Sequence, residues 1–397
     1  MQKTKEVDIY AVNARHKRTR QHVEEDERIL RANRQHIIDF DDDMRRRQLS
    51  VHSRDKVTLI LQRCGRLVKK DFKSMQRPDV EKLVDAILDA EDIGQSWKVE
   101  TQKYFKVFSK WLYKSDEYPD SVKWIHPKPV KVPMINPDHF VNVDEIKKMA
   151  DTETHTRNRA MLKTLWETGL RVGTLLTLKM GDIERDPEGD GCLINMGDGV
   201  QSKTGLWKVP MFYFWTDLAD WLQQHPRKED PQAYIFCDLN GHPGEPISYA
   251  AICKVWRAAL KRCKINRVKI NIHSVRHSSI SWFAQSGLLT TQEVCAKYWG
   301  TAHSGMISRY VHVSAKQTMA KLKGKAPVVE NPRPKTCPRC GVVSDAFEKE
   351  CRGCHKSLTP QDANDHNLML LGMARKLEKL LKENNPQLLA EMQKVGC

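Results

Sequence analysis

The chain has 397 residues, of which 40% are hydrophobic, and it carries a formal net charge of +16 at pH 7. This length suggests two or three domains, and the apolar content suffices for ordinary cores, which excludes a disordered chain. Short apolar runs and a mean hydropathy of -0.60 exclude a protein that spans a membrane. The positive charge favours a polyanionic partner. Because the polar N-terminus lacks the apolar stretch of a signal peptide, we expect a cytoplasmic protein.

The N-terminal third divides into a polar stretch and a helical region. Residues 1–27 are polar and contain a basic stretch at Arg15, Lys17, Arg18 and Arg20. Such a stretch is typical either of a basic arm that lies along a nucleic acid or of a solvated tail. In residues 28–113 the apolar positions recur at the spacing of one helix face, as in Val80, Leu83, Val84, Ile87 and Leu88. This region predicts a small helical domain with a basic surface.

Prolines mark the next boundary. Residues 114–137 contain Pro119, Pro127, Pro129, Pro133 and Pro137. Such density breaks helices and stiffens an extended chain, so we expect a domain linker here. Residues 138–322 form the largest unit, which is mostly helical with one hairpin, its strands expected at Cys192–Met196 and Leu206–Phe212. The expected fold class is therefore mainly α with a small β hairpin, an α+β arrangement.

Four short segments of this unit carry side chains suited to a phosphodiester. They are Gly169-Leu170-Arg171, Ser202-Lys203-Thr204-Gly205, His273-Ser274-Val275-Arg276-His277, and the stretch from Gly300 to Tyr310. Tyr310 offers a phenol as nucleophile, and the two arginines can hold phosphate oxygens with paired hydrogen bonds. Lys203 is suited to protonate the leaving 5′ oxygen, and His273 can hydrogen-bond the phosphate or take the tyrosine proton. Each residue alone is commonplace, but their joint occurrence in this order predicts DNA strand cleavage.

These segments resemble the motifs of the tyrosine recombinases, the lambda-integrase class. Thr168 to Gly173 resembles the first arginine motif, Ser202 to Gly205 with Val209-Pro210 the hairpin lysine motif, His273 to Ser278 the His-x-x-Arg-His box, and Gly300 to His312 the tyrosine segment. The resemblance covers residues 138–320, and the helical region 28–113 is similar to the family's core-binding domain. With a cysteine cluster beyond the tyrosine, the chain is most similar to archaeal-type integrases.

Two positions depart from the family pattern. Thr301 follows Gly300, where the family usually has histidine or tryptophan, and a threonine hydroxyl can hydrogen-bond a phosphate without carrying charge. His303, two residues further on, does not have the family's spacing to Tyr310. Thr174 stands where the family often has an acidic residue. We retain Thr301 as a candidate catalytic residue and expect both departures to affect the rate more than the reaction type.

The resemblance implies a mechanism and partners. Tyr310 would form a 3′-phosphotyrosyl link, Arg171 and Arg276 would clamp the phosphate, Lys203 would act as general acid, and His273 would assist. Because the covalent link stores the bond energy, no ATP or catalytic cofactor is implied. The implied partners are double-stranded DNA attachment sites and a homotetramer of the chain, while an accessory DNA-bending protein stays an open question.

Three alternatives remain open from the sequence. A type IB topoisomerase uses the same attack but religates the same strand. A chromosome-dimer resolvase shares the chemistry, although the added cysteine cluster favours a mobile-element enzyme. A non-catalytic DNA-binding protein of the same fold has Thr301 as its only support.

The C-terminal part begins with two Cys-x-x-Cys pairs, Cys337 with Cys340 and Cys351 with Cys354. Four thiolates at this spacing can close a tetrahedral zinc site with no open position, so residues 335–356 predict a structural, non-catalytic zinc knuckle. Two disulfides or a redox pair are the alternative reading. The other cysteines are scattered singly and fit packed thiols: Cys64, Cys192, Cys237, Cys253, Cys263, Cys295 and Cys397.

The chain ends in an expected amphipathic helix over residues 363–395. Its apolar face carries Leu370, Met373, Leu377, Leu380 and Leu381, and Pro386 interrupts it. Such a face either packs on the body of its own chain or pairs with another subunit. The sequence leaves both open.

Overall fold

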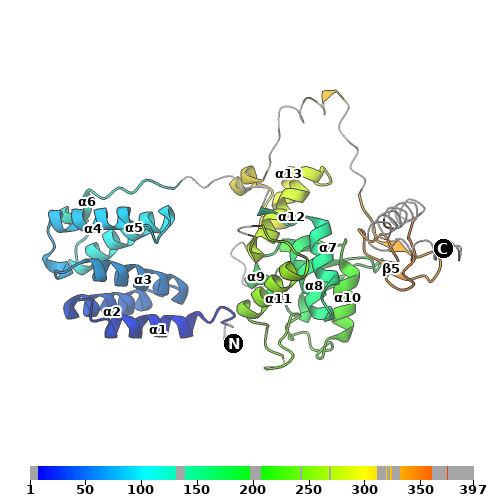
Figure 1. Ribbon diagram of the computed structural model, residues 1–397, viewed down its shortest axis with the longest axis horizontal. Coiled ribbons are helices and arrows are strands. Elements are labelled where there is room, and N and C mark those ends of the chain that lie inside the picture. The colour runs from blue at the N-terminus through cyan, green and yellow to red at the C-terminus, as the bar shows by residue number, and fades with distance from the viewer. Residues whose placement is uncertain are drawn as a thin grey trace, which may run out of the picture. The chain divides into compact units, whose positions relative to one another are not determined.

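The computed structural model describes residues 8–130, 139–196, 207–241, 244–267, 270–310, 319, 322–323, 331–359 and 373. The chain divides into two compact units, one over residues 1–133 and one over residues 134–397 (Figure 1). No helix among the described residues combines the length and the apolar character needed to cross a membrane.

The first unit is built of helices around one apolar core. Its elements are α1 (Val12–Glu25), α2 (Arg31–Arg46), α3 (Val51–Leu67), η1 (Phe72–Ser74), α4 (Arg77–Asp89), α5 (Gln95–Leu112) and α6 (Asp120–Lys123). The predicted face of α4 is buried at Val80, Leu83, Val84 and Ile87, whereas Leu88 is exposed. Phe108 lies at the centre of the core, with its ring 5.4 Å from that of Phe40 and 5.3 Å from that of Phe72. The expected small helical domain is therefore present.

The first helix corrects the expectation of a polar arm over residues 1–27. α1 packs against α2 and α3 and buries His16, Thr19 and Val23. The Thr19 hydroxyl donates to Asp55 at 2.8 Å, and the His16 ring lies 3.1 Å from the Asp41 carboxylate. Because polar and charged pairs hold most of this buried face, hydropathy alone does not reveal that the helix is part of the domain.

Basic residues of the expected arm are used inside this unit. Arg15 donates to Asp55 at 2.7 Å, and Arg20 pairs with Asp41 and Asp42. Arg54 adds two further hydrogen bonds to Asp41, which is fully buried. These arginines neutralise buried carboxylates of the same unit. Their positive charge therefore contributes less to the attraction of a polyanionic partner than the sequence suggests.

The expected linker over residues 114–137 is also shorter than its prolines suggest. α6 lies within it. Val122 of α6 and Ile125, just after α6, lie in the core of the first unit at 1% and 2% exposure. The boundary between the units falls at Pro133 and Met134, within residues 131–138, which lie outside the described part of the chain. Apolar burial after Pro119 thus extends the first unit beyond the first proline.

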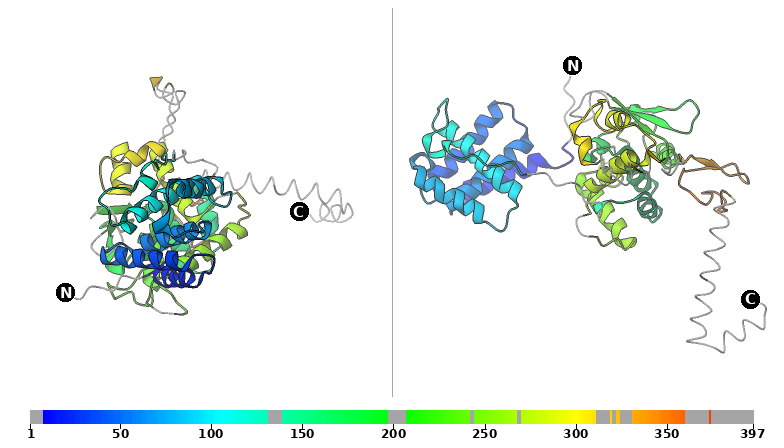
Figure 2. Two further views of the ribbon diagram at one scale, coloured as in Figure 1. Left: turned by 90° about the vertical axis from the view of Figure 1, so that its left-hand side faces the viewer. Right: turned by 90° about the horizontal axis from the view of Figure 1, so that it is seen from above.

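The second unit packs helices around a buried central helix. Its helical elements are α7 (Val143–Asp151), α8 (Thr156–Thr168), α9 (Val172–Leu176), η3 (Met180–Asp182), α10 (Trp215–Gln224), α11 (Tyr249–Arg262), α12 (Ile272–Ser286), α13 (Thr291–Trp299) and η4 (Gly305–Arg309). α8 is buried from Ala160 to Thr168 and contacts α7, α10, α12 and β3 (Figures 1 and 2). The packing of α8 therefore fixes the position of Gly169 and the residues that follow it.

The expected hairpin is confirmed, with one strand added. β2 (Cys192–Met196) pairs antiparallel with β3 (Trp207–Met211), from Cys192 opposite Met211 to Met196 opposite Trp207. β1 (Ile183–Arg185) pairs with the other side of β2. β1 has three residues, which is too short for an alternating pattern to show in the sequence.

The cysteine segment belongs to the second unit. Two-residue strands, β4 (Lys335–Thr336) and β5 (Val343–Ser344), pair antiparallel and bracket the first cysteine pair. The fold class is as expected, mainly helical with small antiparallel sheets. The helix expected over residues 363–395 lies outside the described residues except for Met373.

Candidate active site and cysteine cluster

The start of α12 presents three candidate side chains on one face. The Asn271 side chain caps the helix, because its oxygen accepts the backbone N–H groups of His273 at 2.9 Å and Ser274 at 3.1 Å. His273, Arg276 and His277 follow at positions i, i+3 and i+4, which share a helix face. A local capping signal thus sets the direction in which the His-x-x-Arg-His box points.

Arg276 joins this face to two other segments. Its guanidinium donates to the carbonyl oxygens of Gly169, after α8, and Tyr298, in α13, and is 6% exposed. The rings of Tyr298 and Trp299 lie 5.7 and 5.8 Å from it. Burial, reinforced by the nearby charge of Arg171, lowers the pKa of Arg276 to about 10. The group stays protonated at neutral pH and keeps N–H donors for a further acceptor.

Arg171 lies at the rim of the same site. It is the residue before α9 and is exposed, two residues after the left-handed turn at Gly169 that ends α8. Its charge contributes to lowering the pKa of His273, after burial and Arg276, and also acts on Tyr310. The two arginines predicted from the sequence therefore lie close to the same histidine and tyrosine.

Tyr310 follows η4 and points into this cluster. Its side chain is 2% exposed, and its hydroxyl lies 2.8 Å from Nδ1 of His277. The ring of Trp299 is 6.0 Å from its own. Burial raises the pKa of Tyr310, and the charges of Arg276, Arg309 and Arg171 oppose that rise. The phenol is therefore protonated at neutral pH and needs an acceptor for its proton before it can attack.

His277 is a functional candidate that the sequence reasoning left without a role. Its ring lies 4.8 Å from that of His273 and 5.6 Å from that of Tyr310, between centroids. Burial is the main cause that lowers its pKa to about 4, followed by the charges of His273 and Arg309. The signals in the sequence were its place as the second histidine of the His-x-x-Arg-His box and its position four residues after His273 on an expected helix.

Thr301 and Lys203 stand apart from this cluster in different ways. The Thr301 side chain is exposed, and within the described chain its hydroxyl donates to the carbonyl oxygen of His303 at 3.3 Å rather than to a group of the cluster. Gly300 ends α13 at a φ of +67°, where a side chain would press on the Trp207 ring. Lys203 lies outside the described residues, between Met196 and Trp207, which pair at the end of the hairpin.

A buried pair of charges holds the hairpin against the site. The Glu167 carboxylate, in α8, accepts the backbone N–H groups of Phe212, Tyr213 and Phe214. The Lys297 ammonium, in α13, donates to the carbonyl oxygen of Pro210 at 2.9 Å. Burial raises the pKa of Glu167 and lowers the pKa of Lys297 to about 8. These links fix β3 and the residues after it to α8, which Arg171 follows, and to α13, which Gly300 ends. The sequence analysis did not predict Glu167 or Lys297.

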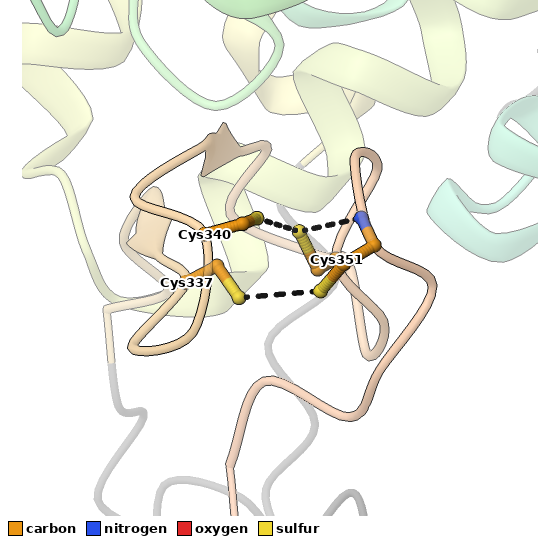
Figure 3. Close-up of side chains that lie close together, drawn as sticks. Cys337, Cys340 and Cys351 are labelled. Carbon is orange, nitrogen blue, oxygen red and sulfur yellow. Dashed lines mark hydrogen bonds between the residues drawn. The ribbon is translucent and has the colours of Figure 1, made fainter.

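The four cysteines converge as their spacing predicts. Figure 3 labels Cys337, Cys340 and Cys351 of this cluster. The Sγ atoms of Cys337 and Cys354 lie 3.6 Å apart, and those of Cys340 and Cys351 lie 3.4 Å apart. All four thiols are free. A tetrahedral zinc with bonds of about 2.3 Å sets its sulfurs about 3.8 Å apart, so the cluster has nearly the size that the metal requires.

The segment between the two cysteine pairs is inserted into the second unit. Ala346 donates its backbone N–H to Tyr213 at 3.1 Å. The Phe347 ring lies 5.4 Å from that of Phe214 and 6.2 Å from that of Trp166. Residues Asp345 to Glu348 therefore pack as an anchoring segment on α8 and the start of α10, which the sequence reasoning did not foresee.

Lys163 is the ionic centre of this contact. Its ammonium, 2% exposed, pairs with Asp217 of α10, with Asp345 at 3.1 Å and with Glu348 at 3.7 Å. Burial lowers its pKa, but the carboxylates overcome this effect and hold its pKa above the usual value. The cysteine segment thus supplies counterions to a lysine in the middle of the central helix.

Comparison with known proteins adds a family and a fold. Residues 139–317 match the model of the phage integrase family. The chain is 25% identical over 204 residues to tyrosine recombinase XerA of Pyrococcus furiosus, an alignment that covers 51% of this chain and 66% of that protein. It is 28% identical over 184 residues to tyrosine recombinase XerD of Listeria innocua, covering 44% and 58%. The chain thus spans less than two thirds of the length of these relatives.

Two solved structures share the fold. A XerH site-specific recombinase bound to its difH substrate superposes with a TM-score of 0.52 and 16% identity, covering 81% of this chain and 97% of that one. A lambda integrase tetramer bound to a Holliday junction gives a TM-score of 0.54 and 13% identity, covering 70% and 76%. At these identities the likeness concerns the arrangement of the helices and sheets.

Proposed function

Because this chain belongs to the tyrosine recombinase family, we propose that it is a site-specific DNA recombinase that cuts and rejoins strands through a 3′-phosphotyrosyl link. The observation that carries the proposal is the cluster of Tyr310, Arg276, Arg171 and His273, which three segments distant in the sequence bring together. Such a set provides a nucleophile and positive charge around one phosphate.

Each side chain has a defined task in the proposed cleavage. The Tyr310 oxygen attacks the scissile phosphorus, and the bond from phosphorus to the 5′ oxygen breaks. Arg171 and Arg276 bind the non-bridging oxygens and stabilise their negative charge in the transition state. Lys203 gives a proton to the leaving 5′ oxygen, a role that rests on the resemblance of its motif. His273, exposed in the first turn of α12, contacts the phosphate. Thr301, at the exposed turn after α13, adds a hydrogen bond rather than a charge.

Duplex DNA is the proposed partner. The net charge of +16 favours contacts with phosphates, and these would supply most of the affinity. We assign DNA binding to the helical first unit and catalysis to residues 138–322, with base contacts and DNA shape selecting the attachment site. Since lambda integrase forms a tetramer on a Holliday junction, we propose a homotetramer for this chain on two DNA sites, in the cytoplasm with the DNA. An accessory DNA-bending protein belongs to the same proposal.

The cysteine cluster is proposed to hold one structural zinc ion. Cys337, Cys340, Cys351 and Cys354 supply four thiolates with no position left for a substrate. Backbone N–H groups of Gly353 and Cys354 point at the Cys351 sulfur at 3.3 and 3.5 Å, which favours a thiolate. The metal would brace the anchoring segment and take no part in strand cleavage.

Trapping on nicked DNA tests the proposed function. A nick close to the scissile phosphate makes the released strand, which carries the free 5′-hydroxyl, so short that it diffuses away. The covalent adduct then accumulates and survives denaturation. We expect this adduct from the wild-type chain and its complete loss in Tyr310→Phe, with DNA affinity unchanged. An adduct that persists in the variant would mean that another residue is the nucleophile.

The same preparation separates the alternatives. Relaxation of supercoiled DNA without exchange between two attachment sites would assign a type IB topoisomerase activity. Salt-sensitive DNA binding without an adduct, on the native attachment sequence as well, would assign a non-catalytic DNA-binding role.

A further inference from the structure

The histidine that contacts the nucleophile is His277 and not His273. Its Nδ1 atom lies 2.8 Å from the Tyr310 hydroxyl, and the two rings are tilted by 33° with centroids 5.6 Å apart. From this geometry we propose that His277 is a catalytic residue that accepts the Tyr310 proton during cleavage and returns it during rejoining. This inference rests on the proposed recombinase function and assigns one of its proton transfers.

The surroundings of His277 keep its ring in the accepting form. His273 and Arg276 lie on its own helix, and Arg309 approaches from η4 with Tyr310. All three can carry positive charge, and the ring is partly buried, so a second proton on the imidazole is disfavoured. In the tautomer that the proposal requires, the single imidazole proton is on Nε2, and the Nδ1 lone pair accepts the hydroxyl proton of Tyr310.

The proton transfer completes the balance of the cleavage step. As the Tyr310 oxygen forms its bond to phosphorus, its proton passes to Nδ1 of His277. The bond from phosphorus to the 5′ oxygen breaks, and that oxygen takes a proton from the general acid. In rejoining, a 5′-hydroxyl attacks the phosphotyrosine and returns its proton to the general acid. The bond from phosphorus to Tyr310 breaks, and His277 gives the Tyr310 oxygen its proton back.

The reactivity of the pair changes when DNA arrives. In the free chain the pKa of Tyr310 is raised and the pKa of His277 is lowered, so the proton stays on the phenol. A bound phosphodiester adds negative charge beside the imidazole, which makes it more basic. Formation of the phosphorus–oxygen bond makes the phenol proton more acidic at the same time. The transfer is therefore favoured only in the presence of substrate, and the free enzyme keeps a neutral nucleophile.

His273 is left for a different task. Its ring is exposed at the first turn of α12, while His277 lies one turn deeper in contact with Tyr310. The more exposed histidine can meet a phosphate, whereas the half-buried one meets the nucleophile. The two histidines of the motif thus divide between substrate and nucleophile.

His277→Asn tests the proposal because an asparagine amide can hold the tyrosine hydroxyl without accepting its proton. Cleavage is measured in single turnover on nicked DNA with two scissile groups, an ordinary phosphodiester and a 5′-bridging phosphorothiolate. The thiolate leaves without a proton and so makes the general acid unnecessary. We expect His277→Asn to slow cleavage of both substrates by about 100-fold or more. Lys203→Ala should be slow only on the ordinary phosphodiester.

Two controls separate a chemical effect from a folding effect. His355→Asn makes the same exchange at an exposed residue with a φ of +56°, a conformation that asparagine adopts readily, and should cleave like the wild type. DNA affinity of His277→Asn should equal that of Tyr310→Phe. If His277→Asn does not fold, the wild-type chain still gives an answer. Its cleavage of the phosphorothiolate should show a normal solvent deuterium isotope effect, because the tyrosine proton is then the only one transferred.

The outcomes distinguish a failure of the role of His277 from a failure of the proposed recombinase function. Cleavage by a folded His277→Asn within threefold of wild type on both substrates would overturn the role of His277 while leaving the recombinase assignment intact. So would the lack of any solvent isotope effect on the phosphorothiolate. Failure of the wild-type chain to form any adduct would instead remove the proposed function itself.

Discussion

Gly169 combines two demands at one backbone position. It ends α8 at a φ of +55°, and its carbonyl oxygen accepts the Arg276 guanidinium. A Cβ atom here would collide with the Tyr298 ring. The turn therefore sets both the direction of the chain toward Arg171 and the position of Arg276.

Gly169→Ala should destabilise the second unit by about 2 kcal/mol or more, because backbone strain and a steric collision add. Urea unfolding measures the change. Gly189→Ala is the matched control, since Gly189 has a φ of +80° but nothing within 4 Å of an added Cβ. It should lose only about 1 kcal/mol. Equal losses in the two variants would show that the contact with Tyr298 is not tight.

At the residue scale, a rare combination of groups was enough to predict which residues lie together, and their roles in cleavage stay proposals. Tyr310, Arg171, Arg276 and His273 were all named, and the structure brings them to one cluster. The contact of His277 with Tyr310 could not be predicted, because it joins residues 33 positions apart through the packing of α12 and η4. Glu167 and Lys297 were missed because a single charge in a helical pattern is usually a surface group.

The stability of α8 depends on its contact with the anchoring segment, which lies far from it in the sequence. Lys163→Met would remove the cation nearest to the buried Asp217 and Asp345, while Arg159 stays 3.9 Å from Asp217. The loss should cost about 3–5 kcal/mol in the free energy of unfolding. Lys208→Met is the control: Lys208 pairs with Glu184 at about half exposure, and its loss should cost about 1 kcal/mol or less. A small effect of Lys163→Met would mean that water reaches the site.

The cysteine cluster gives a prediction of metal content. Cys337→Ser should lower bound zinc, measured by elemental analysis of the purified chain, and speed amide hydrogen exchange over residues 331–359. Adduct formation by Tyr310 should persist, since the metal takes no part in cleavage. Cys253→Ser, outside the cluster, should keep the zinc. Full zinc in Cys337→Ser would contradict the four-thiolate site.

At the element scale, periodic apolar residues predicted helices and strands correctly, whereas elements held by polar contacts were not predicted. The face of α4 and the hairpin of β2 and β3 followed from spacing alone. α1 and the anchoring segment were not foreseen, because what holds them is mostly paired charges, together with the single aromatic Phe347. A carboxylate in a sequence carries no mark of whether its partner lies in solvent or in another helix.

For the molecule as a whole, net charge should dominate its affinity for DNA. The logarithm of the binding constant should fall linearly with the logarithm of salt concentration, because bound phosphates release counterions. With six to ten phosphate contacts the loss is about 10³- to 10⁵-fold between 50 and 200 mM salt. Titration of the full chain on intact duplex, by fluorescence anisotropy, gives the slope. A flat response would contradict backbone contacts as the main source of affinity.

The sequence predicted two or three domains, and the chain divides into two compact units. Proline density indicated a boundary between a helical unit and a larger mixed unit, and the chain does divide there. The first unit nevertheless begins earlier and ends later than expected, at α1 and after Ile125. Composition marks where a chain is unable to form helices, whereas a domain ends where burial ends.

The anchoring segment also constrains how this lineage can change. The family match stops at residue 317, yet Phe347, Asp345 and Glu348 complete the packing of a helix inside the matched region. A deletion at that boundary would expose Trp166 and Phe214, and Lys163 would lose Asp345 and Glu348 while keeping Asp217 of α10. The cysteine segment is therefore not a removable appendage. A related chain could lose this segment only after substitutions on α8 and α10 that replace its contacts. Losing the segment therefore requires more changes than keeping it.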